Sequence, residues 1–139
     1  MGVLVRMVQP KRKGSQFELL IYKDLVNYGE CKRTIGSGSS TEPGDILFKT
    51  YAIECKHLKQ VRWVNLTKFW NKLNKEVDDY HKIGLNLKKP IIDTAIIFRQ
   101  NREPIMVMCR MKYKDKTTRG ILSYNIWKQI IKWKVLKDL

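Results

Sequence analysis

The sequence predicts a single mixed α/β domain over residues 1–139, with helices and strands in the order α-β-β-α-β-β-α. Two observations predict this class. Apolar residues recur at helical spacing in three stretches, and short runs rich in β-branched and aromatic residues, bounded by turn residues, lie between those stretches. In addition, the 139 residues contain no repeat and no linker, which indicates one domain whose core needs no disulfide or structural metal.

The first predicted helix covers residues 15–30, SQFELLIYKDLVNYGE, and stops at Gly29. Its helical spacing is carried by Phe17, Leu20, Ile21, Leu25 and Tyr28. Ser15 and Glu18 have the spacing of a capping box, which predicts a helix start at Ser15. The following residues, 35–44, are so rich in Gly and Ser that they predict a loop.

Two strands, 45–48 and 51–56, are predicted next, with a tight turn at Lys49 and Thr50 between them. A second helix is predicted from Asn65 to Tyr80. Its single apolar face consists of Leu66, Phe69, Trp70, Leu73, Val77 and Tyr80. The lysines of this segment and the acids Glu76, Asp78 and Asp79 fall mostly off that face.

The last third of the chain predicts a hairpin and a helix. Residues 91–99 and 104–111 are apolar runs that predict two strands, with a turn at 100–103. Residues 81–90 and the basic stretch 113–120, YKDKTTRG, predict loops. The C-terminal helix, 123–139, has Ser123 as its N-cap and is apolar on more than one side, which suits self-association.

Charge sets the class of partner. Lys and Arg number 28 against 13 Asp and Glu, a formal charge of +15, and such a surplus attracts polyanions, of which nucleic acid is the commonest. A solvated basic surface without a partner is the alternative. No apolar run approaches the ~18 residues of a membrane span, so we expect no membrane association. Three cysteines without zinc-site spacing indicate reduced thiols and a cytoplasmic location.

Acidic residues in the most strand-like stretch of this basic chain suggest a metal site. Glu54 and Lys56 share one face of a strand, and Asp45 joins them if the hairpin register allows it. Two adjacent carboxylates repel one another, a cost that Mg²⁺ or Mn²⁺ removes, and a lysine beside the ion can orient an attacking water. The structural alternatives are that Asp45 is a turn residue and that Glu54 forms a structural ion pair with Lys56 or with a distant arginine.

The order of these residues resembles a known nuclease signature. Asp45 followed by Glu54-Cys55-Lys56 resembles the PD-(D/E)XK superfamily, with an acid on one strand and an acid-x-lysine on the next. The segments KRKGSQFELLIYKDL, GSGSSTEPGD and YAIECK follow the order found in archaeal-type Holliday junction resolvases, and IIFRQNREPIMVMCR is similar to small viral nucleases of this fold. The resemblance implies a restriction-endonuclease-like core with a mixed central sheet of about four to five strands flanked by helices.

The resemblance also implies roles for individual residues. Glu18 would be an acid carried by the first helix, Asp45 and Glu54 the metal ligands, and Lys56 the catalytic lysine. Ser37 and Ser39 would approach the scissile backbone. The sequence departs from the pattern at two places, because the proline stands two residues before Asp45 and Cys55 replaces the usual valine or isoleucine. DNA-backbone contacts are expected from Lys11, Arg12, Lys13 and Arg33, and from the basic residues of 112–119.

The resulting prediction is a Mg²⁺-dependent endonuclease, with Mn²⁺ able to replace Mg²⁺, that acts as a homodimer on branched DNA such as four-way junctions. In a viral case its location would be the host cytoplasm. Two alternatives stay open: a sequence-specific or restriction-like endonuclease of the same fold, and a non-catalytic basic DNA-binding protein. The tryptophans can stack on bases, although Trp70 belongs to an apolar helix face and is expected in the core.

Overall fold

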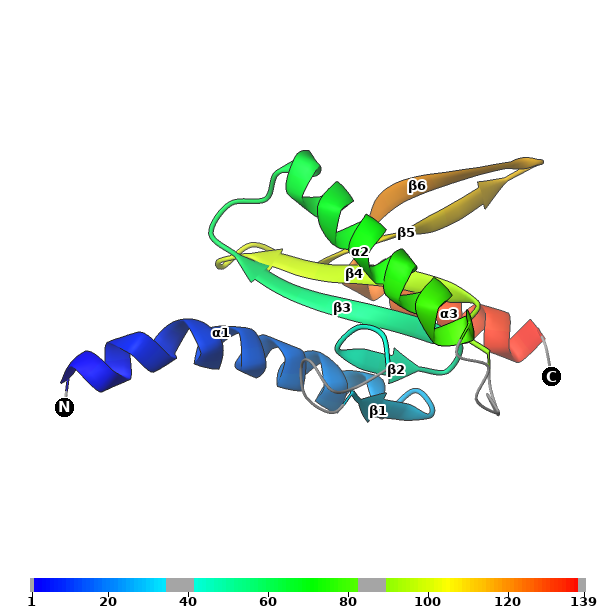
Figure 1. The fold of residues 1–139 in the computed structure, drawn as a ribbon. Coiled ribbons are helices and arrows are strands. Elements are labelled where there is room, and N and C mark those ends of the chain that lie inside the picture. Colours follow the sequence, from blue (N-terminus) through cyan, green and yellow to red (C-terminus); the bar gives the residue numbers. More distant parts are fainter. Residues whose placement is uncertain (1, 35–41, 83–89, 138–139) are drawn as a thin grey trace.

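The computed structural model describes residues 2–34, 42–82 and 90–137, and for 2–13, 113 and 133–137 the backbone alone. Within these residues, the strands form one six-stranded sheet in the order β1-β2-β3-β4-β5-β6, with helices on both faces (Figure 1). The elements are α1 (Gly2–Leu25), β1 (Cys31–Arg33), β2 (Ile46–Phe48), β3 (Tyr51–Leu58), α2 (Trp63–Lys82), β4 (Asp93–Gln100), β5 (Met106–Tyr113), β6 (Lys116–Ser123) and α3 (Tyr124–Lys137).

The first helix is longer than predicted. It begins at Gly2, so Ser15 and Glu18 lie inside α1 and the capping-box interpretation is wrong. Pro10 and Gly14 favour a helix start after them, yet α1 passes through both. Glu18 is therefore not a helix cap, which frees its carboxylate for other contacts.

The predicted sheet is also too small. β1 was missed because it contains three residues, two of them charged. The stretch 113–120 is a second hairpin rather than a loop, since β5 runs to Tyr113, turns at Lys114 and Asp115, and returns as β6. The lysines of this stretch favoured a loop prediction and outweighed the strand preference of the β-branched Thr117 and Thr118. Lysine is nevertheless common on edge strands, because it opposes edge-to-edge aggregation. The described sheet thus has six strands instead of four to five.

Other predicted elements are confirmed. β2 and β3 form the expected hairpin, turning at Lys49, whose φ of 53° is the left-handed conformation of a tight turn. β4 and β5 form the second hairpin. Ser123 caps α3, because its Oγ accepts a 3.2 Å hydrogen bond from the N–H of Ile126. No helix in the described residues is long and apolar enough to cross a membrane.

Two hydrophobic clusters cover the two sheet faces. One packs α1 and α3 against the sheet; its helical members are Phe17, Ile21, Leu25, Tyr124, Trp127 and Ile131. The other packs α2 against the opposite face, where Leu66, Leu73 and Val77 meet Ala52, Ile96, Phe98 and Met108. Trp127 is therefore a core residue, whereas Trp70, expected in the core, is only partly buried and packs at the margin of the second cluster.

The sheet forks between β2 and β3, and this fork positions the acids. β2 pairs with β3 only as far as Ile46 opposite Ile53. β3 continues to Leu58 beside its parallel neighbour β4, which the chain reaches through the crossover helix α2. From Glu54 onward, β3 therefore borders an opening at its β2 side, and both α1 and α2 can send side chains there.

Candidate active site

The hairpin register brings Asp45 and Glu54 together. Ile46 is opposite Ile53, so continuing the antiparallel register by one residue places Asp45 level with Glu54. Both belong to the sheet face covered by α2, since Leu47 and Ala52, two residues away from each, pack in the α2 cluster. The sequence did not decide on which face of the sheet Asp45 lies, and the structure places it on the same face as Glu54.

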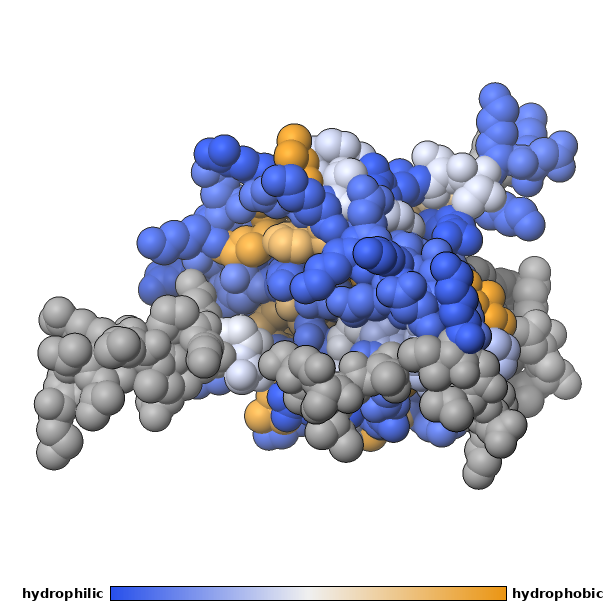
Figure 2. Space-filling view, viewed as in Figure 1, coloured by the Kyte–Doolittle hydropathy of each residue, from blue (hydrophilic) through white to orange (hydrophobic). Residues whose placement is uncertain are grey.

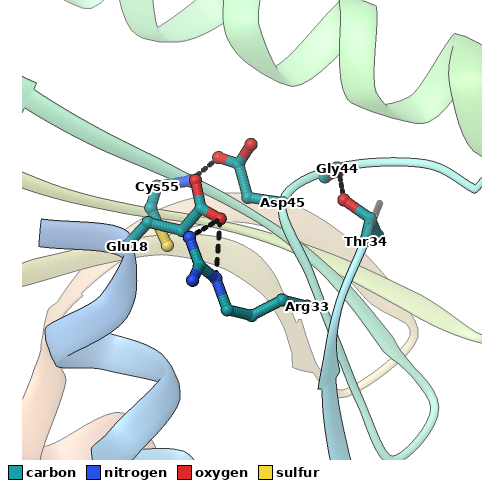
Figure 3. Close-up of polar contacts among 6 residues, drawn as sticks. All are labelled: Glu18, Arg33, Thr34, Gly44, Asp45 and Cys55. Carbon is teal, nitrogen blue, oxygen red and sulfur yellow. Dashed lines mark hydrogen bonds and ion pairs between the residues drawn. The ribbon is translucent and has the colours of Figure 1, made fainter. Parts of the chain in front are cut away.

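Asp45 is held by three hydrogen bonds, two of its backbone and one of its side chain. Its N–H donates to the carbonyl of Ile53 at 2.8 Å, and its carbonyl accepts from the N–H of Thr34 at 2.9 Å. Its carboxylate Oδ2 accepts a 2.8 Å hydrogen bond from the N–H of Cys55 (Figure 3), at the point where β3 has passed the end of β2. Asp45 is thus a fixed part of the fork, and the interpretation as a simple turn residue does not describe it.

Lys56 lies beside Glu54. The two residues are one position apart on the same face of β3, and Lys56 Nζ is 3.4 Å from Glu54 Oε1. The ammonium also lies 4.7 Å from the centre of the Phe69 ring on α2. An acid, a second acid and a lysine are therefore clustered between β3 and α2, the grouping that the signature requires.

Glu18 reaches the same fork from α1. Its Oε1 accepts two hydrogen bonds from Arg33 of β1, at 3.1 Å from Nε and 3.0 Å from Nη2 (Figure 3). Burial, and then the charge of Asp45, raise the pKa of Glu18, while Arg33 opposes that shift. Glu18 is thus close enough for the negative charge of Asp45 to affect its ionisation, and the positive charge of Arg33 offsets part of that effect. Arg33, for which the sequence predicted a phosphate contact, is hydrogen-bonded to Glu18 in the structure.

A fourth acid, Glu76, was missed by the sequence reasoning. Its Oε2 accepts a 3.0 Å hydrogen bond from the N–H of Gly44, directly before Asp45, and its charge raises the pKa of both Asp45 and Glu54. Glu76 follows Phe69 by seven residues, which puts it at the edge of the apolar face of α2 facing Lys56. That spacing was the available signal.

Electrostatics favour a cation between the two strand acids. Burial, and then the charge of Asp45, raise the pKa of Glu54 to about 7, although Lys56 lowers it in part. Burial raises the pKa of Asp45 too, against the opposing effects of the Cys55 N–H, Lys56 and a hydrogen bond with Glu54. Without a metal, the pair therefore retains a proton near neutral pH. A divalent cation would displace that proton.

The donor set fits a hydrated hard cation. Asp45 and Glu54 offer carboxylate oxygens, the ligands that Mg²⁺ and Mn²⁺ prefer. Within the described residues, no group of three or more acidic, histidine or cysteine side chains is arranged to hold a metal by itself. Asp45 and Glu54 would hold such an ion, and water and a phosphate could supply its other ligands, as is common for Mg²⁺.

The remaining predicted site residues lie away from the fork, outside the described residues, or in a segment whose backbone alone is described. Ser37 and Ser39 lie outside the described residues, and of Lys11, Arg12 and Lys13 only the backbone is described, in α1. The basic residues of 112–119 lie on the β5–β6 hairpin, away from the fork in the strand order. Glu42, three residues before Asp45, forms a 2.7 Å ion pair with Lys32 of β1.

These features define a class of protein. An acid at the end of one strand, with an acid and a lysine two residues apart on its neighbour, on a mixed sheet covered by helices, is the arrangement of a PD-(D/E)XK nuclease. A family model described as "Phage putative PDDEXK endonuclease" matches residues 9–138, and the chain belongs to that family. The predicted superfamily and the predicted endonuclease class are thereby confirmed.

Two further comparisons complete the picture. Among solved structures, the chain is similar to Hjc, a Holliday junction resolvase from Archaeoglobus fulgidus, with a TM-score of 0.43 and 16% sequence identity. That match covers 84% of this chain and 93% of the Hjc chain. A comparison with curated proteins finds no match.

Proposed function

We propose that this nuclease is a Mg²⁺-dependent DNA endonuclease that cuts branched DNA, with four-way junctions as its main substrate. The observation that carries the proposal is the pairing of Asp45 with Glu54 across the β2–β3 fork, with Lys56 beside them. Two half-buried, adjacent carboxylates with raised pKa values suit a divalent cation better than a purely structural role. The charge of +15 supplies the attraction for a polyanion that these acids lack.

Each residue has a proposed task in phosphodiester hydrolysis. Asp45 and Glu54 hold the ion, which when bound lowers the pKa of water and stabilises charge on the phosphate. Lys56, 3.4 Å from Glu54, orients the attacking water and stabilises negative charge on the phosphate. Water forms a bond to phosphorus and gives up a proton to solvent, while the bond from phosphorus to the leaving deoxyribose oxygen breaks and that oxygen takes up a proton. Glu18, paired with Arg33, adds a negative charge next to Asp45 on the side of α1.

Conservative substitutions of the two strand acids test the chemistry. Glu54→Gln and Asp45→Asn are expected to lower the rate of DNA cutting in Mg²⁺ by about 10²-fold or more, because they remove ligand charge without changing size. Glu42→Gln is the matched control, since Glu42 pairs with Lys32 outside the fork. Cutting at full rate by Glu54→Gln would exclude the assignment, and a wild type that binds DNA without cutting it in Mg²⁺ or Mn²⁺ would indicate a non-catalytic binding protein.

The branched substrate is tested separately. Purified protein is incubated with a four-way junction and with linear duplexes of the same arm sequences, with Mg²⁺ or with EDTA. Preferential cutting of the junction supports the proposal. Preferential cutting of linear duplex at one sequence would replace it with the restriction-like alternative while leaving the roles of Asp45, Glu54 and Lys56 unchanged.

A homodimer is part of the proposal, because paired cuts in a junction need two sites. α3 offers a surface for it: Ile126 is 50% exposed and Ile130, one turn further, is 40% exposed. Ile126→Glu is expected to convert a dimer to a monomer in light scattering. Asn125→Glu, a neighbouring exposed position, is the control. A monomeric wild type would contradict this part.

A further inference from the structure

An aromatic and cationic cluster lies where the first turns of α2 meet β6. The guanidinium of Arg119 is 5.0 Å from the ring centre of Trp63 and 5.8 Å from that of Trp70. These tryptophans are seven residues apart, so they stand on one side of α2, two turns from each other. Trp63 is 53% exposed, so much of its ring stays open to solvent. The fold leaves a large aromatic surface uncovered next to a cation.

The strand register adds positive charge beside this cluster. Arg119 pairs directly with Arg110 of β5, and two residues further Lys112 pairs with Thr117. Residues directly opposite in an antiparallel pair share a face, and here it is the face of Met108, which packs in the α2 cluster. Like charges placed opposite one another destabilise a hairpin, so Arg110 and Arg119 weaken the fold unless an anion lies between them.

The hairpin that carries these cations extends beyond the rest of the sheet. Figure 1 shows β5 and β6 running out from the body of the molecule, and Figure 2 shows the projecting end as hydrophilic. Arg110, Lys112 and Lys116 are exposed along it. A partner can therefore reach the cations and Trp63 together without displacing a helix.

The helix α2 joins this cluster to the acids. Its N-terminal half carries Trp63 and Trp70 beside Arg119, and its C-terminal half carries Glu76 beside Gly44. Both the acids of the fork and the arginines of the hairpin belong to the α2 face of the sheet. A nucleic-acid strand on that face can contact the tryptophans and Arg119 at the N-terminal half of α2 while one of its phosphodiesters reaches the acids at the C-terminal half.

We propose that Trp63, Trp70 and Arg119 form a stacking site for an unpaired nucleobase of the DNA substrate, with Arg110 and Lys112 contacting its phosphates. The proposal rests on the nuclease function proposed above. Indole and guanidinium planes are the groups on which unpaired bases stack, and neighbouring cations bind the connecting phosphates. Fully paired duplex offers no free base plane, so the site would favour branch points, gaps and single-stranded ends.

Binding without cutting tests the site. Single-stranded DNA with one 2-aminopurine, and a blunt duplex of the same sequence, are titrated with protein in EDTA. We expect the wild type to quench 2-aminopurine on the single strand, and Trp63→Ala to lower the ratio of single-strand to duplex affinity by about tenfold. Trp63→Phe should retain most of that ratio, because a phenyl ring still stacks. Val64→Ala, at a neighbouring position that is 63% exposed, is the matched control.

Charge is separated from stacking by salt and by a second substitution. Arg110→Gln is expected to lower the salt slope of single-strand binding by about one ion, whereas Trp63→Ala leaves that slope unchanged. Unchanged single-strand selectivity in Trp63→Ala, with wild-type binding and Mg²⁺-dependent cutting intact, would overturn the stacking site alone. A wild type that neither binds nor cuts DNA would overturn the proposed function and this site together. Thermal unfolding of each variant establishes that it is folded.

Discussion

The carboxylate of Asp45 accepts a 2.8 Å hydrogen bond from the backbone N–H of Cys55. Asp45 directly precedes the first residue of β2, so this contact joins the start of β2 to β3 just past the point where their pairing stops. The position of Asp45 is therefore fixed by the backbone of the strand that carries Glu54, and the distance between the two acids does not depend on a flexible loop. Such preorganisation lets a cation bind without further folding of the site.

In the absence of a divalent cation, the stability of the protein is expected to depend on the ionisation of Glu54. Its pKa is raised from 4.5 to about 7 by burial and then by Asp45, so the folded protein binds a proton that the unfolded chain has released. This stabilisation is complete below the unfolded pKa and is lost as pH rises through about 7. The free energy of unfolding in EDTA should fall by roughly 1 kcal/mol per pH unit across that window.

Urea unfolding of wild type and Glu54→Gln, each in EDTA at several pH values, measures this effect. The difference between the two proteins isolates Glu54 from the other titrating groups. Added Mn²⁺ should stabilise the wild type most at the alkaline end, because the ion binds the ionised carboxylates. A wild-type stability that rose relative to Glu54→Gln across the window would contradict the prediction.

Glu76 is expected to act on the site both through its charge and through its hydrogen bond to Gly44. Glu76→Gln keeps an oxygen acceptor for the Gly44 N–H but removes a charge that raises the pKa of Glu54, so the pH window above should move to lower values. Glu76→Ala also leaves that N–H without its acceptor, at a cost of about 1 kcal/mol. Asp79→Asn, an exposed position on the same helix, is the control and should shift nothing.

The glycine before Asp45 is expected to tolerate no side chain. Gly44 has a φ of +73°, and a Cβ there would lie 2.6 Å from the carbonyl oxygen of Ile53. Gly44→Ala should therefore destabilise the protein by about 2 kcal/mol or more and displace Asp45. Gly14→Ala is an opposite control, because nothing lies within 4 Å of its Cβ position in α1, and it should stabilise the helix by up to about 1 kcal/mol. Equal stability of the two variants would be inconsistent with this geometry.

The sequence predicted the parts of the site that depend on local pattern. The alternation along β3 placed Glu54 and Lys56 on one face, and the turn at Lys49 predicted the hairpin that brings Asp45 opposite. It could not predict the contact of Glu76 with Gly44, which depends on how α2 crosses the sheet. It also missed β6, since cross-strand pairing outweighed the loop-like composition of 113–120.

A substitution of Lys56 can show whether this residue is catalytic or only forms a structural ion pair with Glu54. Nζ lies 3.4 Å from Glu54 Oε1 and over the Phe69 ring, so Lys56→Met keeps much of the packing and removes the charge. If Lys56 serves the water, this variant should cut DNA about 10²–10⁴-fold more slowly and still be stabilised by Mn²⁺. If the pair is only structural, the variant should lose stability and keep the activity of its folded fraction. Lys68→Met, an exposed lysine of α2, controls for loss of charge, and cutting by Lys56→Met at the rate of that control would exclude the catalytic role.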